Sequence, residues 1–406
     1  MPGPLQGIRV LDWTVWQQGT SGSAVLADLG ADVIKIEEPV SGDPGRGLVQ
    51  VQQAGGISGY FQALNRGKRS LALDLKHSKG REALLRLTRD ADVFFTNFRP
   101  GVGERLGIDY VELAKANPRI IYARASGWGR NGPEAEEGSF DLLGQARGGL
   151  MSINGDPDGP PRNVGAPVAD QVGGIMAVLG IMAALWHREK TGKGQQVDTS
   201  LLGTVLALQS FNLTTYMLSG IVPQRVRRPS ALPFWNTYAG GDGRHFVIGI
   251  LQNRNWPDIC DVIGRAELLE DERFAKYVNR VGAHAKELIA LLDEAFAQRP
   301  AQEWVDALCQ RGVFAALVQD YSEVVRDPQV LANEYIVNVE RPDGPPVGMV
   351  TTPIQFTETP TTIESLAPEL GQHTEEVLLE AGYSWEEIEA LRNEGAIGPR
   401  HDAEAE

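Results

Sequence analysis

An isolated carboxylate, Asp170, stands in the stretch from Asn163 to Gly174, and no further charge follows it before His187 and Arg188. The change from a proline-containing apolar segment to a glycine pair predicts that an extended segment turns into a buried helix here. The free N–H groups and positive dipole end of a helix N-terminus favour an ionised carboxylate, which can act as a nucleophile. The simpler interpretation is that Asp170 only caps this helix, a position that Asp favours.

The composition is typical of a globular protein. The 406 residues are 42% hydrophobic and 22% charged, which leaves room for two or three domains. A net charge of −15 and a pI near 5.0 argue against a nucleic-acid partner, although a local basic pocket could still hold an anionic cofactor. Two cysteines, Cys260 and Cys309, and six scattered histidines do not predict a disulfide framework or a metal site.

The chain also lacks the patterns of targeting or membrane insertion. The start, Met1 to Pro4, has neither a basic region nor an apolar region of the signal-peptide kind. The long uncharged runs 171–186 and 199–224 are interrupted by Gly, Gln, Asn, Ser and Thr, so they predict buried helices rather than membrane spans. We therefore expect a cytoplasmic protein without a membrane partner.

Strand and helix patterns alternate through the first half of the chain. Residues 7–13 and 31–37 are strand-like and flank a short helical segment at 21–29, which predicts a βαβ unit. Further strands are expected at 70–75, 91–95 and 119–126. The pattern predicts an α/β fold: a Rossmann-like large domain with a parallel sheet, whose ligands bind at the carboxyl ends of the strands.

Shifts in composition divide the chain into domains. Residues 1–221 are expected to form the first part of the large domain, and 222–229 a linker. Residues 230–325 predict a smaller α/β domain that opens with two strands, and 326–400 predict a return linker and the last part of the large domain. The tail, 401–406, is expected to be disordered.

A nicotinamide-dependent dehydrogenase is an alternative, because Glu37 ends the second expected strand. The glycine fingerprint of such proteins is incomplete here, however. Gly19-x-x-Gly22 lacks a third glycine, and the preceding loop is too long. A change in NADH fluorescence on mixing would favour this alternative.

Several segments in the same order resemble the family III CoA-transferases, which include formyl-CoA transferase, carnitine CoA-transferase and the α-methylacyl-CoA racemases. The resemblance covers nearly the whole chain and is carried by residues 7–12, 26–37, 42–44, 65–70, 73–76, 97–101, 164–174 and 371–375. It implies an enzyme (EC 2.8.3 type) that moves coenzyme A from an acyl-CoA to a free carboxylic acid. It also implies an interlocked homodimer with long linkers between domains, and a heteromer with a homologous subunit remains open.

The resemblance assigns the chemistry to Asp170. Its carboxylate is expected to form an acyl anhydride and then an aspartyl-CoA thioester, in the manner of covalent catalysis. Gln17 matches a pocket glutamine of the transferases and is expected to donate a hydrogen bond to the oxyanion. The alternative for Gln17 is a loop residue bonded to nearby backbone.

The resemblance also implies a groove for coenzyme A. Basic side chains in it would suit the phosphates, although an ordinary solvated charge is the alternative for each of them. The residues at the matching positions are Lys76, Asn97, Phe98, Arg105 and Leu106.

Other positions weaken or extend the assignment. Glu38 stands where formyl-CoA transferase has an arginine at the adenine, so this contact is open, and Arg69 and Arg124 are weaker basic candidates. Phe140 stands where the racemases have a histidine base, which disfavours the racemase alternative.

Aromatic residues near this position suggest the character of the substrate. Trp16, Trp128 and Phe140 could line an acyl pocket larger or more apolar than oxalate or formate needs, and core packing is the alternative for Trp128. A CoA-binding subunit without activity is a further alternative, which the presence of Asp170 disfavours.

Overall fold

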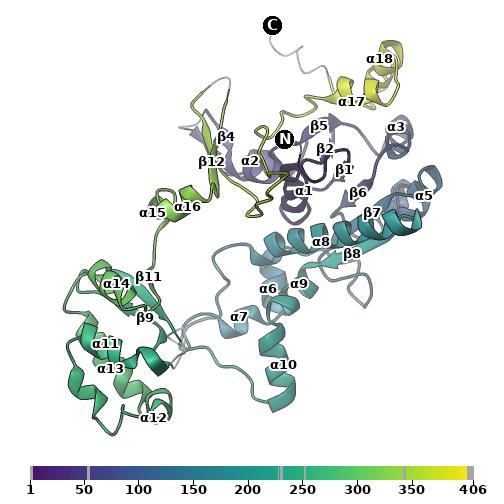
Figure 1. Cartoon of the computed structure of the whole chain (residues 1–406). Helices are drawn as coiled ribbons and strands as arrows, with labels where there is room; N and C mark the ends of the chain where they lie inside the picture. Colours follow the sequence, from purple (N-terminus) through teal and green to yellow (C-terminus); the bar gives the residue numbers. More distant parts are fainter. Residues whose placement is uncertain are drawn as a thin grey trace. The chain divides into compact units, whose positions relative to one another are not determined.

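A computed structural model shows two compact units (Figure 1). The first contains 1–152, 162–223 and 331–406, and the second contains 153–161 and 224–330. The predicted disordered tail, 401–406, lies outside the described residues. The structure describes residues 3–52, 55–226, 228, 232–250, 253–341 and 344–399.

The first unit is built on a six-stranded parallel sheet with the order β5-β2-β1-β6-β7-β8. This is the order of a doubly wound Rossmann-type sheet, in which the strand order reverses between β1 and β6. The predicted α/β class is therefore confirmed. The strands are β1 (Arg9–Trp13), β2 (Asp32–Glu37), β5 (Arg69–Ala72), β6 (Val93–Thr96), β7 (Ile121–Ser126) and β8 (Gln196–Ser200).

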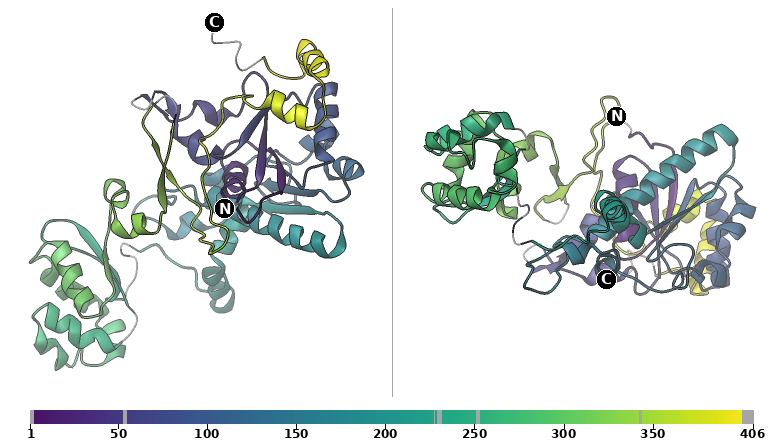
Figure 2. Two further views of the ribbon diagram at one scale, coloured as in Figure 1. Left: turned by 45° about the horizontal axis from the view of Figure 1, so that its top comes forward. Right: turned by 90° about the horizontal axis from the view of Figure 1, so that it is seen from below.

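Helices cover both faces of this sheet (Figures 1 and 2). Alternate strand residues enter different cores: Val10 packs with residues of α1 and α8, whereas Leu11 packs with residues of the opposite layer. The first face is covered by α1 (Gln18–Asp28) and α8 (Val168–Thr191), and the second by α3 (Ser78–Thr88), α5 (Tyr110–Ala116), α17 (Thr374–Glu380) and α18 (Trp385–Asn393).

Small residues bring α1 and α8 into close contact. A Cβ atom added to Gly22 would lie 2.9 Å from the carbonyl oxygen of Gly174, and one added to Gly174 would lie 2.3 Å from Ser21 Oγ. The glycines after Asp170 are therefore needed for this approach. The contact places the first turns of both helices side by side.

The second unit contains a three-stranded antiparallel sheet, β11-β10-β9, packed against helices. The predicted strand pair is found as β9 (Trp235–Ala239) and β10 (His245–Gly249). Residues 153–161, assigned above to the large domain, group with this unit, which otherwise runs from 224 to 330. Arg225 Nη1 donates to the carbonyl oxygen of Gly159 at 2.7 Å and ties the two segments together.

The remaining elements complete the two units. In the second unit these are α11 (Trp256–Val262), α12 (Tyr277–Val281), α13 (Ala285–Phe296), α14 (Ala301–Gln310), β11 (Ala315–Leu317), α15 (Tyr321–Val324) and α16 (Pro328–Ala332). Those of the first unit, with α7 at its boundary, are β3 (Gln50–Val51), β4 (Ile57–Ser58), α2 (Gly59–Asn65), α4 (Val102–Leu106), α6 (Asp141–Arg147), α7 (Leu150–Ile153), α9 (Leu201–Leu208), α10 (Ser210–Ser219), β12 (Ile336–Val339) and β13 (Val347–Val350).

Candidate active site

A cavity of about 500 Å³ lies at the carboxyl ends of β1, β6 and β7 in the first unit. Its walls are the loops that follow these strands, a segment at 137–142 and the first turn of α8. Because β1 and β6 flank the point where the strand order reverses, this is the crevice in which doubly wound sheets bind ligands.

Asp170 lines this cavity from the third position of α8. The N-cap position belongs to Pro167, so the interpretation of Asp170 as the helix cap is wrong. Asp141, at the start of α6, caps the helix instead: its Oδ1 accepts from the N–H groups of Ala169 at 2.7 Å and Asp170 at 3.3 Å. Within the described residues, no hydrogen bond or ion pair occupies the carboxylate of Asp170, which therefore remains available to a ligand.

Burial, and secondly the charge of Asp141, raises the pKa of Asp170 to about 7. The sequence-based expectation that a helix N-terminus keeps this carboxylate ionised is therefore wrong. The reason is that burial disfavours the charged form, while Asp141 takes the terminal N–H groups and adds a negative charge. Tyr60 is also affected, because burial and then the charges of Asp170 and Asp43 raise the pKa of its phenol. Tyr60 is thus a neutral hydroxyl beside two carboxylates.

Asp141→Asn should lower the pKa of Asp170, because the amide removes the nearby charge while its oxygen can still accept from α8. If the ionised form is the active one, the pH profile should move towards lower pH. The shift should be roughly half a unit to one unit. The pH dependence of kcat/KM in the two proteins measures it, and Asp141→Ala separates loss of the cap from loss of charge. An unchanged profile would contradict this role.

The loop after β1 brings Trp16 to the cavity in a strained conformation, with φ of +61°. Two side chains hold it. Asp43 Oδ1 accepts from Trp16 N–H at 3.3 Å, and the carboxamide of Asn97 bonds both backbone groups of Val15, at 2.9 Å and 2.7 Å. Asn97, which was assigned to the CoA groove, lines this first cavity, and its carboxamide positions the loop. The ring of Trp16 meets that of Phe140 edge to face at 6.1 Å.

Of the other residues predicted for the pocket, some line the cavity of Asp170 and some do not. Gln17 lines the cavity, and its side chain makes no hydrogen bond within the described part of the chain. Trp128 does not line it, so its proposed place in the acyl pocket is wrong. The guanidinium of Arg147 lies over the Trp128 ring, 4.8 Å from its centre. This contact accounts for the position of Trp128.

A second cavity of about 340 Å³ adjoins the first and shares Val15, Trp16 and Phe98 with it. Three of the residues assigned to the CoA groove line it: Lys76, Phe98 and Leu106. Trp13 stacks on Phe98 with 4.2 Å between ring centres and fixes that ring. Arg105 lines neither cavity. The two cavities therefore adjoin, with Lys76 in the wall of one and Asp170 in the wall of the other.

Comparison with known proteins identifies the family. The model of CoA-transferase family III matches residues 5–374. The chain belongs to CoA-transferase family III. It is 40% identical to acetyl-CoA:oxalate CoA-transferase from Acetobacter aceti, over 82% of this chain and 86% of that protein. It is 36% identical to succinate–glutarate CoA-transferase from Agrobacterium fabrum, over 93% and 95%.

A solved relative agrees. The crystal structure of a CAIB/BAIF family protein from Brucella suis is 33% identical and superposes with a TM-score of 0.84, covering 94% of this chain and all of that one. The protein is therefore a CoA-transferase, an enzyme of the EC 2.8.3 type whose substrates are an acyl-CoA and a carboxylic acid.

Three further residues of this CoA-transferase, considered above for contacts with coenzyme A, bond to other parts of the protein. Glu38 lines the second cavity, but its carboxylate accepts from Val40 N, Ser41 N and Ser41 Oγ and so closes its own turn. Arg69 bonds Asp32, Glu376 and Glu380, and Arg124 bonds Asp198. Neither arginine lines the cavities described here.

The residues of the first cavity that sequence reasoning missed include Gln18, Tyr60, Arg99 and Asp141. Arg99 lies within the segment 97–101 that carried the resemblance, and Asp141 follows Phe140, which was considered as the place of a base and as a residue of the acyl pocket. No local pattern marks Gln18 or Tyr60. Among the described residues, no group of three or more His, Cys, Asp or Glu side chains is arranged to hold a metal ion.

Proposed function

We propose that this CoA-transferase works through Asp170. The observation that carries the proposal is the unpaired carboxylate in a cavity at the sheet's switch point, joined to a groove that Lys76 lines. A carboxylate oxygen of Asp170 attacks the thioester carbonyl, the C–S bond breaks and CoA thiolate leaves. The thiolate then attacks the aspartyl carbonyl of the anhydride, the C–O bond breaks and the donor acid leaves as a carboxylate. The acceptor carboxylate reverses these steps and takes the coenzyme A.

Two neutral groups support the oxyanions of these steps. Gln17 has a free carboxamide in the cavity wall, and Tyr60 has a phenol that stays protonated because burial raises its pKa. Donors placed before the reaction stabilise developing negative charge better than water does. A pKa of about 7 for Asp170 leaves a substantial fraction of the carboxylate ionised at neutral pH, and this fraction can attack.

The acid substrate is proposed to be larger or more apolar than formate or oxalate. The cavity of about 500 Å³ has the Trp16–Phe140 pair in its wall. The relatives named above act on oxalate and on succinate and glutarate, so acids of several sizes occur among them. Phe140 cannot accept a proton, and this favours acyl transfer over racemisation.

Trapping the intermediate tests the function. The protein is incubated with short and medium acyl-CoAs, treated with hydroxylamine, and digested for mass spectrometry. We expect a hydroxamate on Asp170 that depends on the acyl-CoA. Modification at another carboxylate, or at none with every thioester, would exclude this mechanism.

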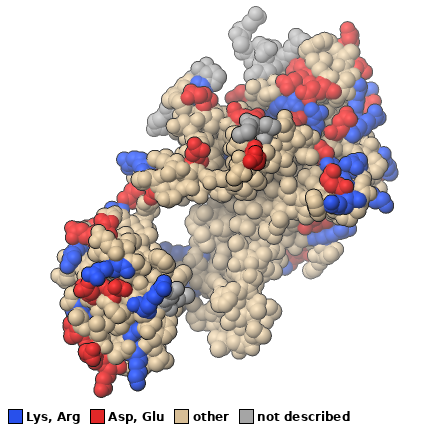
Figure 3. Space-filling model, viewed as in Figure 1, with Lys and Arg blue, Asp and Glu red and all other residues tan. Residues whose placement is uncertain are grey.

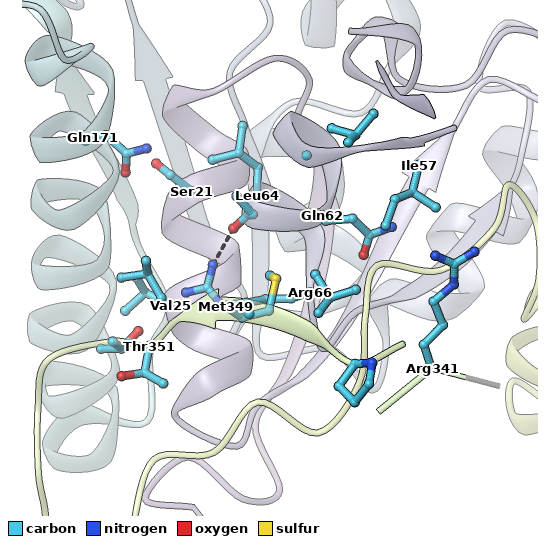
Figure 4. Close-up of a pocket in the computed structure, with 18 of the residues that line it drawn as sticks. Ser21, Val25, Ile57, Gln62, Leu64, Arg66, Gln171, Arg341, Met349 and Thr351 are labelled. Atoms are coloured by element: carbon cyan, nitrogen blue, oxygen red, sulfur yellow. Dashed lines mark hydrogen bonds between the residues drawn. The ribbon is translucent and has the colours of Figure 1, made fainter. Parts of the chain in front are cut away.

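We also propose a homodimer as the working form. Exposed apolar side chains follow one face of α8 at helical spacing: Ile175, Leu179, Met182 and Trp186. Exposed residues of α10 continue this apolar surface, and Figure 3 shows almost no charge over that part of the first unit. Ile175 also lines an apolar cavity of about 780 Å³ between α1, α2, α8 and the β12–β13 segment (Figure 4). A surface of this kind is typical of an interface.

Leu179→Glu should weaken this dimer at least tenfold, because it buries a charge in the interface. Light scattering during size-exclusion chromatography measures the effect, and the wild-type mass should be near twice 44.1 kDa. Val111→Glu, an equally exposed valine on α5, is the control and should not change the mass. A wild-type protein that stays monomeric at high concentration would contradict the proposal.

A cytoplasmic location, without nucleic-acid or membrane partners, is also part of the proposed function.

A further inference from the structure

Gln18, the first residue of α1, carries a carboxamide that the protein leaves without a hydrogen bond. The residue is 6% exposed and its Nε2 atom is buried without a partner. Five other side-chain atoms in the described part of the chain share this condition, but none of them belongs to a residue that lines the cavity of Asp170. An unpaired buried amide is unfavourable, because it has lost its hydrogen bonds to water. Its presence in a substrate cavity therefore points to a bound group that completes it.

The carboxamide lies beside α8, against Gly173, which follows Asp170 in that helix. A Cβ atom added to Gly173 would lie 3.0 Å from Gln18 Nε2 and 3.2 Å from its Cγ. Gly173 follows Asp170 by almost one turn, and side chains of a helix tilt towards its N-terminus. The amide and the carboxylate are therefore separated by roughly one turn, about 5 Å along the helix. A substrate whose reacting carbon lies at Asp170 reaches Gln18 with its far end.

The charges of the cavity indicate what this far end is. Glu137, Asp141 and Asp170 are acidic wall residues. The cation in the described wall is Arg99, which lies elsewhere, against Gly138: a Cβ atom there would be 2.5 Å from Arg99 Nη2. Beside the neutral Gln18, a second carboxylate would be buried without a cation, which is far less favourable than burying a hydroxyl or a ketone. Because neither carboxamide atom is tied to the protein, the group can rotate and present its NH2.

We infer that Gln18 determines substrate specificity by donating a hydrogen bond to an uncharged oxygen, a ketone or a hydroxyl, near the far end of the acyl group. This inference rests on the proposed function only for the position of the reacting carbon at Asp170. It narrows the proposed class of acid substrates. Instead of any acid larger than oxalate, the substrate is an acid with a polar group about three bonds beyond its carboxyl carbon.

Two thioesters of the same shape test this. In isocaproyl-CoA a methyl group replaces the ketone oxygen of levulinyl-CoA. Their dissociation constants are measured by calorimetry on Asp170→Asn protein, which prevents turnover, with and without Gln18→Met. We expect levulinyl-CoA to bind more tightly than isocaproyl-CoA, and Gln18→Met to reduce that preference roughly tenfold. Gln18→Glu, which keeps the shape but turns a donor into an acceptor, should reduce it as well. Gln6→Met, on the exposed N-terminal loop, is the matched control.

Each other result overturns the inference. Equal weakening of both thioesters by Gln18→Met would place Gln18 at the reacting centre or in the fold, and thermal melting of each variant separates these. An unchanged preference would remove Gln18 from recognition. A preference for succinyl-CoA over levulinyl-CoA that Gln18→Met abolishes would show a charged far end. The trapping experiment on wild-type protein decides the chemistry of Asp170 independently, so its failure is distinct from a failure here.

Discussion

Asp170→Asn should reduce CoA transfer at least a thousandfold, since the amide cannot form the proposed anhydride. The same change should stabilise the fold at neutral and higher pH, because it removes a carboxylate that is costly to ionise in its buried position. Two quantities are compared between the variant and the wild type. Activity is measured by chromatography of the acyl-CoAs, and the free energy of unfolding is measured in urea. Glu82→Gln, which makes the same chemical change on an exposed part of α3, is the control and should change neither.

The stability of the wild-type fold should change with pH in a defined direction. The native pKa of Asp170 is about 7, raised from the usual value of 3.8 by burial and by Asp141. Between these values the native state holds a proton that the unfolded state has lost, so stability falls as the pH rises through this window. Asp170→Asn should therefore gain roughly 1–3 kcal/mol over the wild type at pH 8 and little at pH 4. Wild-type activity should rise through about pH 7. A loss of stability in the variant at pH 8 would contradict this account.

The sheet was predictable because its signal is local. β1 and β2 are short segments rich in Val, Ile, Leu and Trp, which predicts buried strands although Asp12 and Lys35 interrupt them, and the glycine at 30 marks the end of the helix between them. The strand β8 was harder, since Gln196, Asp198 and Ser200 interrupt its pattern, and its place is fixed by pairing with β7. Tertiary pairing decided this element rather than propensity.

The site was predictable only where one residue carries the chemistry. Asp170 stands out because it is the lone charge of its segment. Asp141 and Gln18 do not, because their roles depend on where α6 and α1 lie relative to α8. The direction of the pKa shift at Asp170 could not be predicted for the same reason: the sequence shows the helix N-terminus, but it shows neither how deeply the carboxylate is buried nor the second carboxylate beside it.

A second large effect, on the stability of the fold, is expected when one of the buried charges under the active-site loop is removed. Lys68 Nζ lies 2.9 Å from Asp12 Oδ2 and 2.8 Å from Asn65 Oδ1, and the side chains of Lys68 and Asp12 are both fully buried. Although burial alone would raise it, Lys68 and Lys35 lower the pKa of Asp12. Asp12 also accepts from the N–H and Oγ1 of Thr14, at the start of the loop that carries Trp16 and Gln17.

Lys68→Met should therefore destabilise the protein by roughly 3–5 kcal/mol, because it leaves the carboxylate of Asp12 buried with less compensation. Adding Asp12→Asn to this variant should recover most of the loss, since a neutral amide needs no cation. Urea unfolding of both variants and of Lys79→Met, a partly exposed lysine, measures these differences. If the double variant is no more stable than Lys68→Met, the lysine stabilises by packing alone. If it recovers stability but not activity, the charge pair is retained because it holds the loop of Trp16 and Gln17 in place.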